Sequence, residues 1–288
     1  MKTIKDQTFD QERALYNLKD TTLENIKFTG PSDGESALKE ARNCTIKSTF
    51  FDLRYPIWHV KKFILEKSTF TKNSRAPLWY TTDGIITNCE LECPKALREC
   101  CEINIFNTKI SSEEFGWKCQ NIKLEKSFVE SNYLFFDSKN ISLNNVSMKG
   151  KYSFQYINNL SINNSNLDTK DAFWHSENVL VKNSTIKGEY LGWYSKNIRF
   201  ENCTIIGTQP LCYCENIELI NCKMIDTDLA FEYSTVNAII DGDILSIKNP
   251  IEADIVCDNI HEVILEDSLY EPKLNIFERN YVYEKLDI

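Results

Sequence analysis

The chain has no apolar run that approaches the ~20 residues needed for a transmembrane helix. Its first residues, Met1 to Asp6, lack the apolar core of a signal peptide, so we expect a cytoplasmic protein. Basic residues are also too few to balance the acidic ones, and the net charge is −9. Because nucleic-acid and membrane binders neutralise phosphates with Lys and Arg, we expect neither partner.

Glycine and proline are scarce, with 9 and 7 in 288 residues, and no linker or low-complexity segment divides the chain. A single domain over residues 1–288 is therefore expected. Eleven cysteines are present, but their number is odd and some, such as Cys203 and Cys222, recur at equivalent positions of a repeat. This pattern favours buried thiols over disulfides. The Cys212-x-Cys214 spacing is not that of a zinc site, and we predict neither metal nor cofactor.

One short phrase, Asn-apolar-x-apolar, recurs with a constant step of 19 residues between Glu102 and Met224. A fixed period of this length indicates a repeat architecture. The asparagines that open the phrase are Asn121, Asn140, Asn159, Asn178, Asn197 and Asn216.

Within each unit apolar residues alternate with polar ones, as at Ile198 and Phe200, which is typical of a strand rather than a helix. Such units would stack as coils about 4.8 Å apart and bury a continuous core. A step of 19 is a multiple of neither 5 nor 6, which argues against pentapeptide solenoids and left-handed hexapeptide helices. We predict an all-β fold, a single-stranded right-handed parallel β-helix with about 11–12 coils of ~19 residues.

Two further columns of the repeat support this fold. One is small at nearly every coil, as a tight interior corner requires, and includes Thr49, Ser127 and Cys203. The residue before it is usually Asn, which tolerates left-handed backbone and could form a ladder of amide hydrogen bonds along the axis. Lys126 interrupts that column.

The predicted coils occupy residues 41–269, with two residues inserted near 73–77 and a loss of register after Val236. Residues 1–40 do not follow the repeat, and we predict that they form an N-terminal cap over the open core. Asp10 is a candidate N-cap for a short helix over residues 10–16. Residues 270–288 are expected to form a C-terminal cap.

The other half of each coil concentrates aromatic and charged residues in neighbouring columns. All five tryptophans fall in one column: Trp58, Trp79, Arg98, Trp117, Phe136, Gln155, Trp174, Trp193, Cys212 and Phe231. The next column reads His59, Tyr80, Glu99, Lys118, Asp137, Tyr156, His175, Tyr194, Tyr213 and Glu232. A third, four residues earlier, includes Tyr55, Lys95, Glu114, Tyr133, Tyr152, Asp171, Tyr190 and Asp228.

The direction of the tryptophans is open between two interpretations. Small residues two positions later, Cys119 and Ser195, look interior, so strand alternation favours tryptophans that face the core. The column directly before the tryptophans, however, has no polar residue, and both columns cannot face inward on a straight strand. If the tryptophans face outward, they form an apolar platform typical of a binding groove.

The column from His59 to Glu232 is polar, and we predict that it is exposed. Glu99, Lys118 and Asp137 occupy consecutive coils; one interpretation is a solvated ion-pair ladder. The other is catalytic: Glu99 and Asp137 would lie roughly 9.6 Å apart at the backbone, near the upper end of the carboxylate separation of inverting glycosidases. Lys118 would then hold a substrate carboxylate, and His175 is a candidate general base.

Nine motifs in order along the chain resemble the bacterial family of domain of unknown function 3737. They are FDQERALY (9–16), GESALKE (34–40), LRYPIWH (53–59), APLWY (76–80), EFGWKC (114–119), TKDAFWH (169–175), GEYLGWY (188–194), GTQPLC (207–212) and DLAFEYS (228–234). The resemblance implies an architecture similar to pectin lyase-like β-helices. The family has no assigned activity, so the resemblance supplies no catalytic residues. The Asn-Thr-Asp, Gly-His-Gly and Arg-Ile-Lys motifs of polygalacturonases do not occur.

Two functional hypotheses follow. In the first, the strip binds or processes a carbohydrate or a small polar ligand, with Glu99, Lys118, Asp137 and His175 as catalytic candidates. The candidate ligand-binding residues are Trp79, Tyr80, Arg98, Trp117, Tyr156, Trp174, Trp193, Tyr194, Tyr213 and Glu232. In the second hypothesis, the protein is a non-enzymatic scaffold or protein-interaction module, for example a homodimer, that docks through the same strip.

Overall fold

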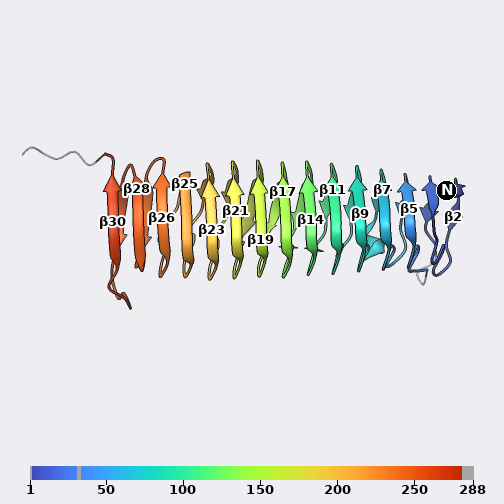
Figure 1. The fold of residues 1–288 in the computed structure, drawn as a ribbon, viewed down its shortest axis with the longest axis horizontal. Coiled ribbons are helices and arrows are strands. Elements are labelled where there is room, and N and C mark those ends of the chain that lie inside the picture. Colours follow the sequence, from blue (N-terminus) through green and yellow to red (C-terminus); the bar gives the residue numbers. More distant parts are fainter. Residues whose placement is uncertain (1, 31–33, 281–288) are drawn as a thin grey trace, which may run out of the picture.

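The computed structural model describes residues 2–30 and 34–280, which form a right-handed parallel β-solenoid of about 14 turns with ~19 residues per turn. Figure 1 shows one row of strands side by side, from the N-terminal coil at one end to the C-terminal coil at the other. This row contains β1 (Lys2–Lys5), β3 (Thr21–Glu24), β5 (Arg42–Lys47), β7 (Lys61–Glu66), β9 (Thr82–Thr87), β11 (Cys101–Phe106), β14 (Gln120–Glu125), β17 (Lys139–Asn144), β19 (Asn158–Asn163), β21 (Glu177–Lys182), β23 (Lys196–Glu201), β25 (Glu215–Ile225), β26 (Thr235–Ile240), β28 (Glu252–Cys257) and β30 (Lys273–Glu278).

A second row of shorter parallel strands follows the first around each coil. It contains β2 (Thr8–Phe9), β4 (Lys27–Phe28), β6 (Phe50–Phe51), β8 (Thr69–Phe70), β10 (Glu90–Glu92), β12 (Lys109–Ser111), β15 (Phe128–Ser131), β18 (Ser147–Lys151), β20 (Asn166–Lys170), β22 (Thr185–Lys187) and β24 (Thr204–Ile206), which pairs with the end of β25. Two smaller pairs are β13 (Glu114–Phe115) with β16 (Tyr133–Leu134), and β27 (Ile244–Lys248) with β29 (Ile260–Ile264). The third side of the coil is made mainly of turns, with β13 and β16 as a short strand pair within it.

The number of residues between strand partners in neighbouring coils explains why the period of 19 was visible only in part of the sequence. It is 19 in the central coils, as between Ile198 and Ile217. It lengthens to 21 between β7 and β9, where the short 3-10 helix η1 (Lys72–Ser74) takes up the predicted insertion. After Val236 the steps change to 17 and then 21, which is the predicted loss of register.

The predicted N-terminal cap and its helix are wrong, and the solenoid has about 14 coils rather than the predicted 11–12. β1 pairs with β3 in parallel, and β3 pairs with β5, so coil stacking starts at Lys2 rather than near residue 41. Arg13 and Leu15 have positive φ, so this segment is a turn of the first coil rather than a helix. The step of 23 between Thr22 and Thr45 hid these coils from the period of 19. At the other end, β30 forms a further coil; residues 281–288 of the predicted C-terminal cap lie outside the described residues.

The interior is filled by inward columns from all three sides. Phenylalanines stack along the axis, with ring centroids 5.2 Å apart for Phe28 and Phe51 and 5.2 Å apart for Phe154 and Phe173. The small column is buried at every coil from Thr49 to Cys222, as predicted. Its hydroxyl groups satisfy corner amides: the N–H of Thr108 donates to Ser127 Oγ at 3.1 Å, a bond that an alanine could not accept.

The asparagine column before the small residues has positive φ throughout, as in Asn107 and Asn202. Side-chain hydrogen bonds between successive coils run from Asn107 to Asn88 at 2.7 Å and from Asn202 to Asn183 at 3.3 Å. Asn183, however, donates to Asn163 rather than to Asn164 of its own column. The predicted ladder is therefore not continuous in this column. Hydrogen bonds between side-chain amides of successive coils occur in the column that opens the repeat phrase. They run from Asn140 to Asn121, Asn159 to Asn140, Asn197 to Asn178 and Asn216 to Asn197.

Candidate functional site

The predicted strip lies on the turn side of the solenoid, where the backbone is not pleated. In one coil Asp171, Phe173 and His175 have φ of 53°, 62° and 54°, and the same left-handed pattern recurs in neighbouring coils. This backbone sends Ala172 and Phe173 into the core together and leaves Trp174 and His175 on the outside. Period-2 alternation therefore does not apply to this segment.

The interpretation that placed the tryptophans in the core is wrong. All five are only partly buried, whereas the column directly before them, which includes Ile57, Leu78 and Leu97, is fully buried. The small residues Cys119 and Ser195 are interior, as expected. The error came from extending strand alternation across residues with positive φ, where two successive side chains can share a side.

Each indole is fixed to the surface by one hydrogen bond to the next coil. Trp174 Nε1 donates to the carbonyl oxygen of Tyr190 at 2.6 Å, and Trp193 Nε1 donates to that of Gln209 at 2.8 Å. Trp58, Trp79 and Trp117 make the equivalent bond to Ala76, Lys95 and Tyr133. These bonds satisfy the polar end of each ring and leave its apolar body partly exposed.

The column next to the tryptophans faces outward and is exposed from Glu99 to Tyr194, whereas His59, Tyr80, Tyr213 and Glu232 at its ends are only partly exposed. Tyr156, His175, Tyr194 and Tyr213 stack in succession with centroid separations of 4.9, 5.1 and 5.0 Å. Tyr156 and Tyr194 are 51% and 45% exposed, which is high for large aromatic side chains. A shorter stack of His59 on Tyr80, at 4.8 Å, lies nearer the N-terminus.

Arg98 fills the place of a ring in the tryptophan column. Its guanidinium carbon lies 4.7 Å from the centroid of Trp79 and 4.8 Å from that of Trp117. The same group lies 3.5 Å from a carboxylate oxygen of Glu114, which also pairs with Lys95 at 2.9 Å. Arg98 is therefore engaged in stacking and ion pairing within the strip.

Glu99, Lys118 and Asp137 interrupt the ring ladder between Tyr80 and Tyr156. All three side chains are exposed. Within the described residues none of them forms an ion pair within 4.0 Å, so the interpretation of a closed ion-pair ladder is not supported at this geometry. Their charged groups are free to meet a ligand, but no surrounding side chain fixes their positions.

The C-terminal end of the predicted site is built differently. Glu232 pairs with Lys248 at 2.8 Å and accepts a hydrogen bond from the Tyr213 hydroxyl at 3.4 Å. Burial and the nearby Glu232 carboxylate raise the pKa of Tyr213 to about 12. Glu232 and Tyr213 thus form a closed group that is less available to a ligand than Tyr194 or His175.

Asp171 is a residue of this strip that the sequence interpretation did not select. It occupies the third column, where neighbouring coils carry Tyr133, Tyr152 and Tyr190, and it is only 7% exposed. Burial raises the pKa of its carboxyl group above the ordinary value, and the charge of Lys170 opposes that rise. The signal in the sequence was an acid that interrupts a column of tyrosines.

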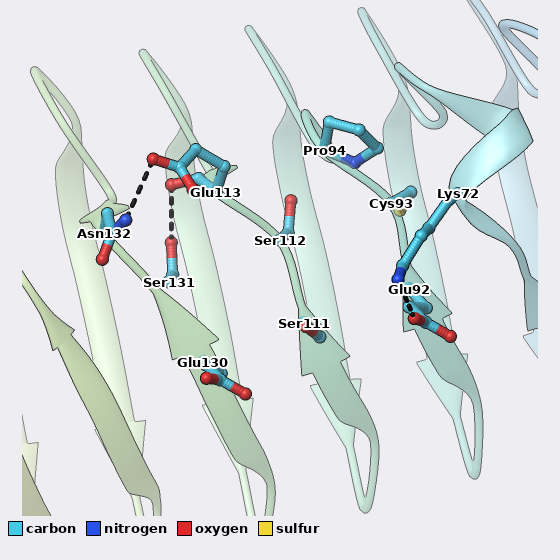
Figure 2. Close-up of a pocket in the computed structure, with 10 residues that line it drawn as sticks. All are labelled: Lys72, Glu92, Cys93, Pro94, Ser111, Ser112, Glu113, Glu130, Ser131 and Asn132. Carbon is cyan, nitrogen blue, oxygen red and sulfur yellow. Dashed lines mark hydrogen bonds and ion pairs between the residues drawn. The ribbon is translucent and has the colours of Figure 1, made fainter.

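A hollow of about 350 Å³ lies beside the strip, where the second row of strands turns toward it. Figure 2 shows Lys72 extending from η1 to Glu92, with an N–O separation of 3.2 Å. Glu113 accepts a hydrogen bond from Asn132 at 2.9 Å, and Ser131 donates to its main-chain oxygen. These bonds engage Lys72, Glu92, Glu113, Ser131 and Asn132 with one another.

The cysteines and potential metal ligands do not form a reactive cluster. All eleven thiols are free, and Cys101 alone among them is not buried. Within residues 2–30 and 34–280, no group of three His, Cys, Asp or Glu side chains is arranged to hold a metal ion. In the same part of the chain, no helix has the length and apolar character required to cross a membrane.

The stacked coils and the aromatic strip define a parallel β-solenoid with an external aromatic surface. The chain belongs to the DUF3737 family of proteins of unknown function, whose sequence profile matches residues 2–277. No match to a curated protein is found.

Solved structures resemble the chain in fold alone. PfbA, a surface adhesin of Streptococcus pneumoniae, is 12% identical with a TM-score of 0.38, over 80% of this chain and 70% of that one. The A-module of the mannuronan C-5 epimerase AlgE4 of Azotobacter vinelandii is 11% identical with a TM-score of 0.28, over 94% and 89%. These low scores carry no information about activity.

Proposed function

We propose that the protein binds an extended carbohydrate along the aromatic strip. The observation that carries the proposal is the exposed ladder of Tyr156, His175 and Tyr194, which runs beside Trp174 and Trp193. An exposed aromatic surface rimmed by polar groups is typical of a binding site rather than of a plain surface. A solenoid also repeats such a surface at regular intervals, which suits a polymer with a repeating unit.

The chemistry of the strip agrees with a polar, ring-containing ligand. The tyrosines offer hydroxyl groups and the imidazole of His175 offers ring nitrogens, while the apolar bodies of the indoles give contact area. Lys118, Glu99 and Asp137 are exposed at the break in the ladder and add charged groups that form no ion pair with another described residue. A cytoplasmic location and a bacterial origin stay predictions of the sequence.

Tryptophan fluorescence provides the test, because all five tryptophans lie in this strip. Hexasaccharides of β-1,4-linked glucose, mannose and galacturonic acid would be titrated in the presence of iodide. We expect iodide to quench the partly exposed indoles and a bound sugar to protect them. Tyr194→Ala should weaken binding roughly tenfold, as expected for the loss of one aromatic contact. Phe128→Ala removes an aromatic residue that is 42% exposed but lies in β15, away from the strip, and should have no effect.

Absence of saturable binding to all three hexasaccharides would refute the proposal, and so would an equal loss in the Phe128 variant. Catalysis by Glu99 and Asp137 is a separate prediction. It requires hydrolysis of a bound hexasaccharide by the wild type, and loss of hydrolysis with retained binding in Glu99→Gln and Asp137→Asn.

A second candidate function is protein docking through the same surface. It is favoured by the mutual stacking of the rings, since each internal ring covers its neighbours and presents mainly its edge to solvent. Such a surface suits a second protein as well as a sugar. Light scattering distinguishes the two: a dimer that Tyr194→Ala converts to a monomer would favour docking.

A further inference from the structure

Asp171 is a largely buried residue of the strip, and its carboxylate oxygens, which keep some contact with solvent, have no hydrogen-bond or ion-pair partner among the described residues. Its backbone is fully engaged: its N–H donates to the Glu189 oxygen at 2.9 Å, and its own main-chain oxygen accepts from Gln155 Nε2 at 3.1 Å. Its side chain makes no hydrogen bond or ion pair within the described residues, although the residue is 93% buried. A carboxylate that is partly removed from water and has no protein partner is less stable than a fully solvated one, and its accessible oxygens are open to hydroxyl donors from outside the protein.

The neighbouring lysines do not supply that partner. Lys170 pairs with Glu189 at 2.8 Å and lies over the Tyr190 ring, 5.2 Å from its centroid. Lys151 lies over the Tyr152 ring at 5.3 Å. Neither ammonium group comes within 4.0 Å of the Asp171 carboxylate. When Asp171 and Glu189 are ionised, their two negative charges balance the positive charges of Lys151 and Lys170. The surroundings therefore select for neither a cation nor an anion.

The fold itself does not require an acid at this position. Tyr152 and Tyr190 occupy the same place one coil before and one coil after, and their φ of 54° and 56° match the 53° of Asp171. A tyrosine is therefore compatible with the backbone here. Successive coils are about 4.8 Å apart, so the backbones of the two tyrosines lie about 4.8 Å from that of Asp171, one on either side.

We propose that Asp171 is the polar anchor of the strip and that it accepts hydrogen bonds from two adjacent hydroxyl groups of a neutral pyranose. A carboxylate can accept two hydrogen bonds side by side, which matches the spacing of neighbouring sugar hydroxyls. The apolar face of the same sugar packs against the flanking tyrosines. The inference deepens the proposed carbohydrate binding and rests on it, because it names the ligand class and the residue that selects it.

The test combines binding and stability measurements on Asp171→Asn. The amide has nearly the same shape but removes the unpaired charge, so the melting temperature should rise. The affinity for the glucose or mannose hexasaccharide should fall at least tenfold, since the charge-assisted acceptor is lost. Asp168→Asn is the matched control, because Asp168 is exposed on β20 of the same coil and should change neither quantity. Asp171→Tyr, which installs the residue of the adjacent coils, should also fold stably and lose binding.

Each outcome decides a different point. If Asp171→Asn lowers the melting temperature, the carboxylate stabilises the fold and the inference is wrong. If both Asp171 variants bind like the wild type while Tyr194→Ala does not, the inference fails and the proposed function stands. If the wild type binds only the galacturonic acid hexasaccharide, the strip binds sugar but the neutral class is wrong. If no hexasaccharide binds, both the inference and the proposed function are refuted.

Discussion

The guanidinium of Arg98 stacks on the indole of Trp79, with its central carbon 4.7 Å from the ring centroid. Trp117 lies on the other side at 4.8 Å, so a cation occupies a position that other coils fill with a ring. Guanidinium is suited to this place because it is planar and weakly hydrated. The stack therefore continues across the coil at which the neighbouring column becomes charged.

Replacement of Arg98 by alanine should lower the free energy of unfolding by about 1–2 kcal/mol, because two cation–π contacts are lost. Arg98→Lys should retain only part of this stabilisation, since an ammonium group is not planar and cannot stack on the two indoles. Urea unfolding followed by far-ultraviolet circular dichroism measures both. Lys118→Ala, one coil away and without an ion pair, serves as the control and should be near neutral. Equal stability of the Arg98→Ala variant and the wild type would contradict the role of the stack.

The indole hydrogen bonds should be measurable one at a time. Trp193→Phe keeps an aromatic ring on Trp174 but removes the donor to the Gln209 oxygen, which lies 2.8 Å away. We expect a loss of about 1 kcal/mol in the free energy of unfolding. A larger loss in Trp193→Ala, which also removes the ring contact, would separate stacking from hydrogen bonding. If Trp193→Phe is as stable as the wild type, the bond to Gln209 does not contribute.

Gly116 lies in the buried column where other coils carry phenylalanine or leucine, and its φ is +76°. A Cβ at this position would lie 2.3 Å from Cδ1 of Phe135, so Gly116→Ala should destabilise by about 2–4 kcal/mol through overpacking and backbone strain. Gly242→Ala is the control, because its φ of +109° is also unfavourable but nothing lies within 4 Å of the added Cβ. A smaller Phe135→Leu side chain should relieve part of the Gly116→Ala defect. If the two variants lose similar amounts of unfolding free energy, backbone strain explains both losses and overpacking against Phe135 does not contribute.

Stability should decline at alkaline pH because buried thiols cannot ionise in the core. Burial raises the pKa of Cys89 to about 11 and those of Cys212 and Cys214 to about 12. The unfolded chain releases these protons near pH 9 while the folded chain retains them, so stability is lost as the pH rises from about 9 toward 11–12. For Cys89 the loss is on the order of 2 kcal/mol.

Urea midpoints at pH 7, 9 and 10.5 measure this decline. Cys89→Ser is a suitable variant because Ser68 and Thr108 occupy the same column in the adjacent coils. It should flatten the decline without a large loss at pH 7. An unchanged slope in this variant would show that Cys89 does not cause the effect.

The sequence predicted the parts of the fold that repeat with period 19. The small column that includes Ser127, the outward ladder that includes Tyr194 and the stacking of coils along one axis all followed from that period. The sequence prediction failed where the local backbone departs from a pleated strand. Trp174 faces outward because Phe173 and His175 have left-handed backbone angles. Such dihedral angles are not visible in a pattern of apolar residues.

The site shows the same division. The strip was predicted because its columns are rich in aromatic and charged residues. Asp171 was not selected, since its importance depends on burial and on the engagement of Lys170 with Glu189, which only three-dimensional positions show. Glu232 was selected for its charge, but its pairing with Lys248 could not be inferred across 16 residues of irregular spacing.

The backbone hydrogen bonds between coils all point along the long axis of the molecule. Tension applied between the two ends would therefore load these bonds a few at a time, and the chain would peel off coil by coil at low force. Tension applied across the axis would instead be carried by the covalent backbone within each coil. The solenoid is thus mechanically anisotropic: easily unwound from an end, and stiff against a pull on its sides.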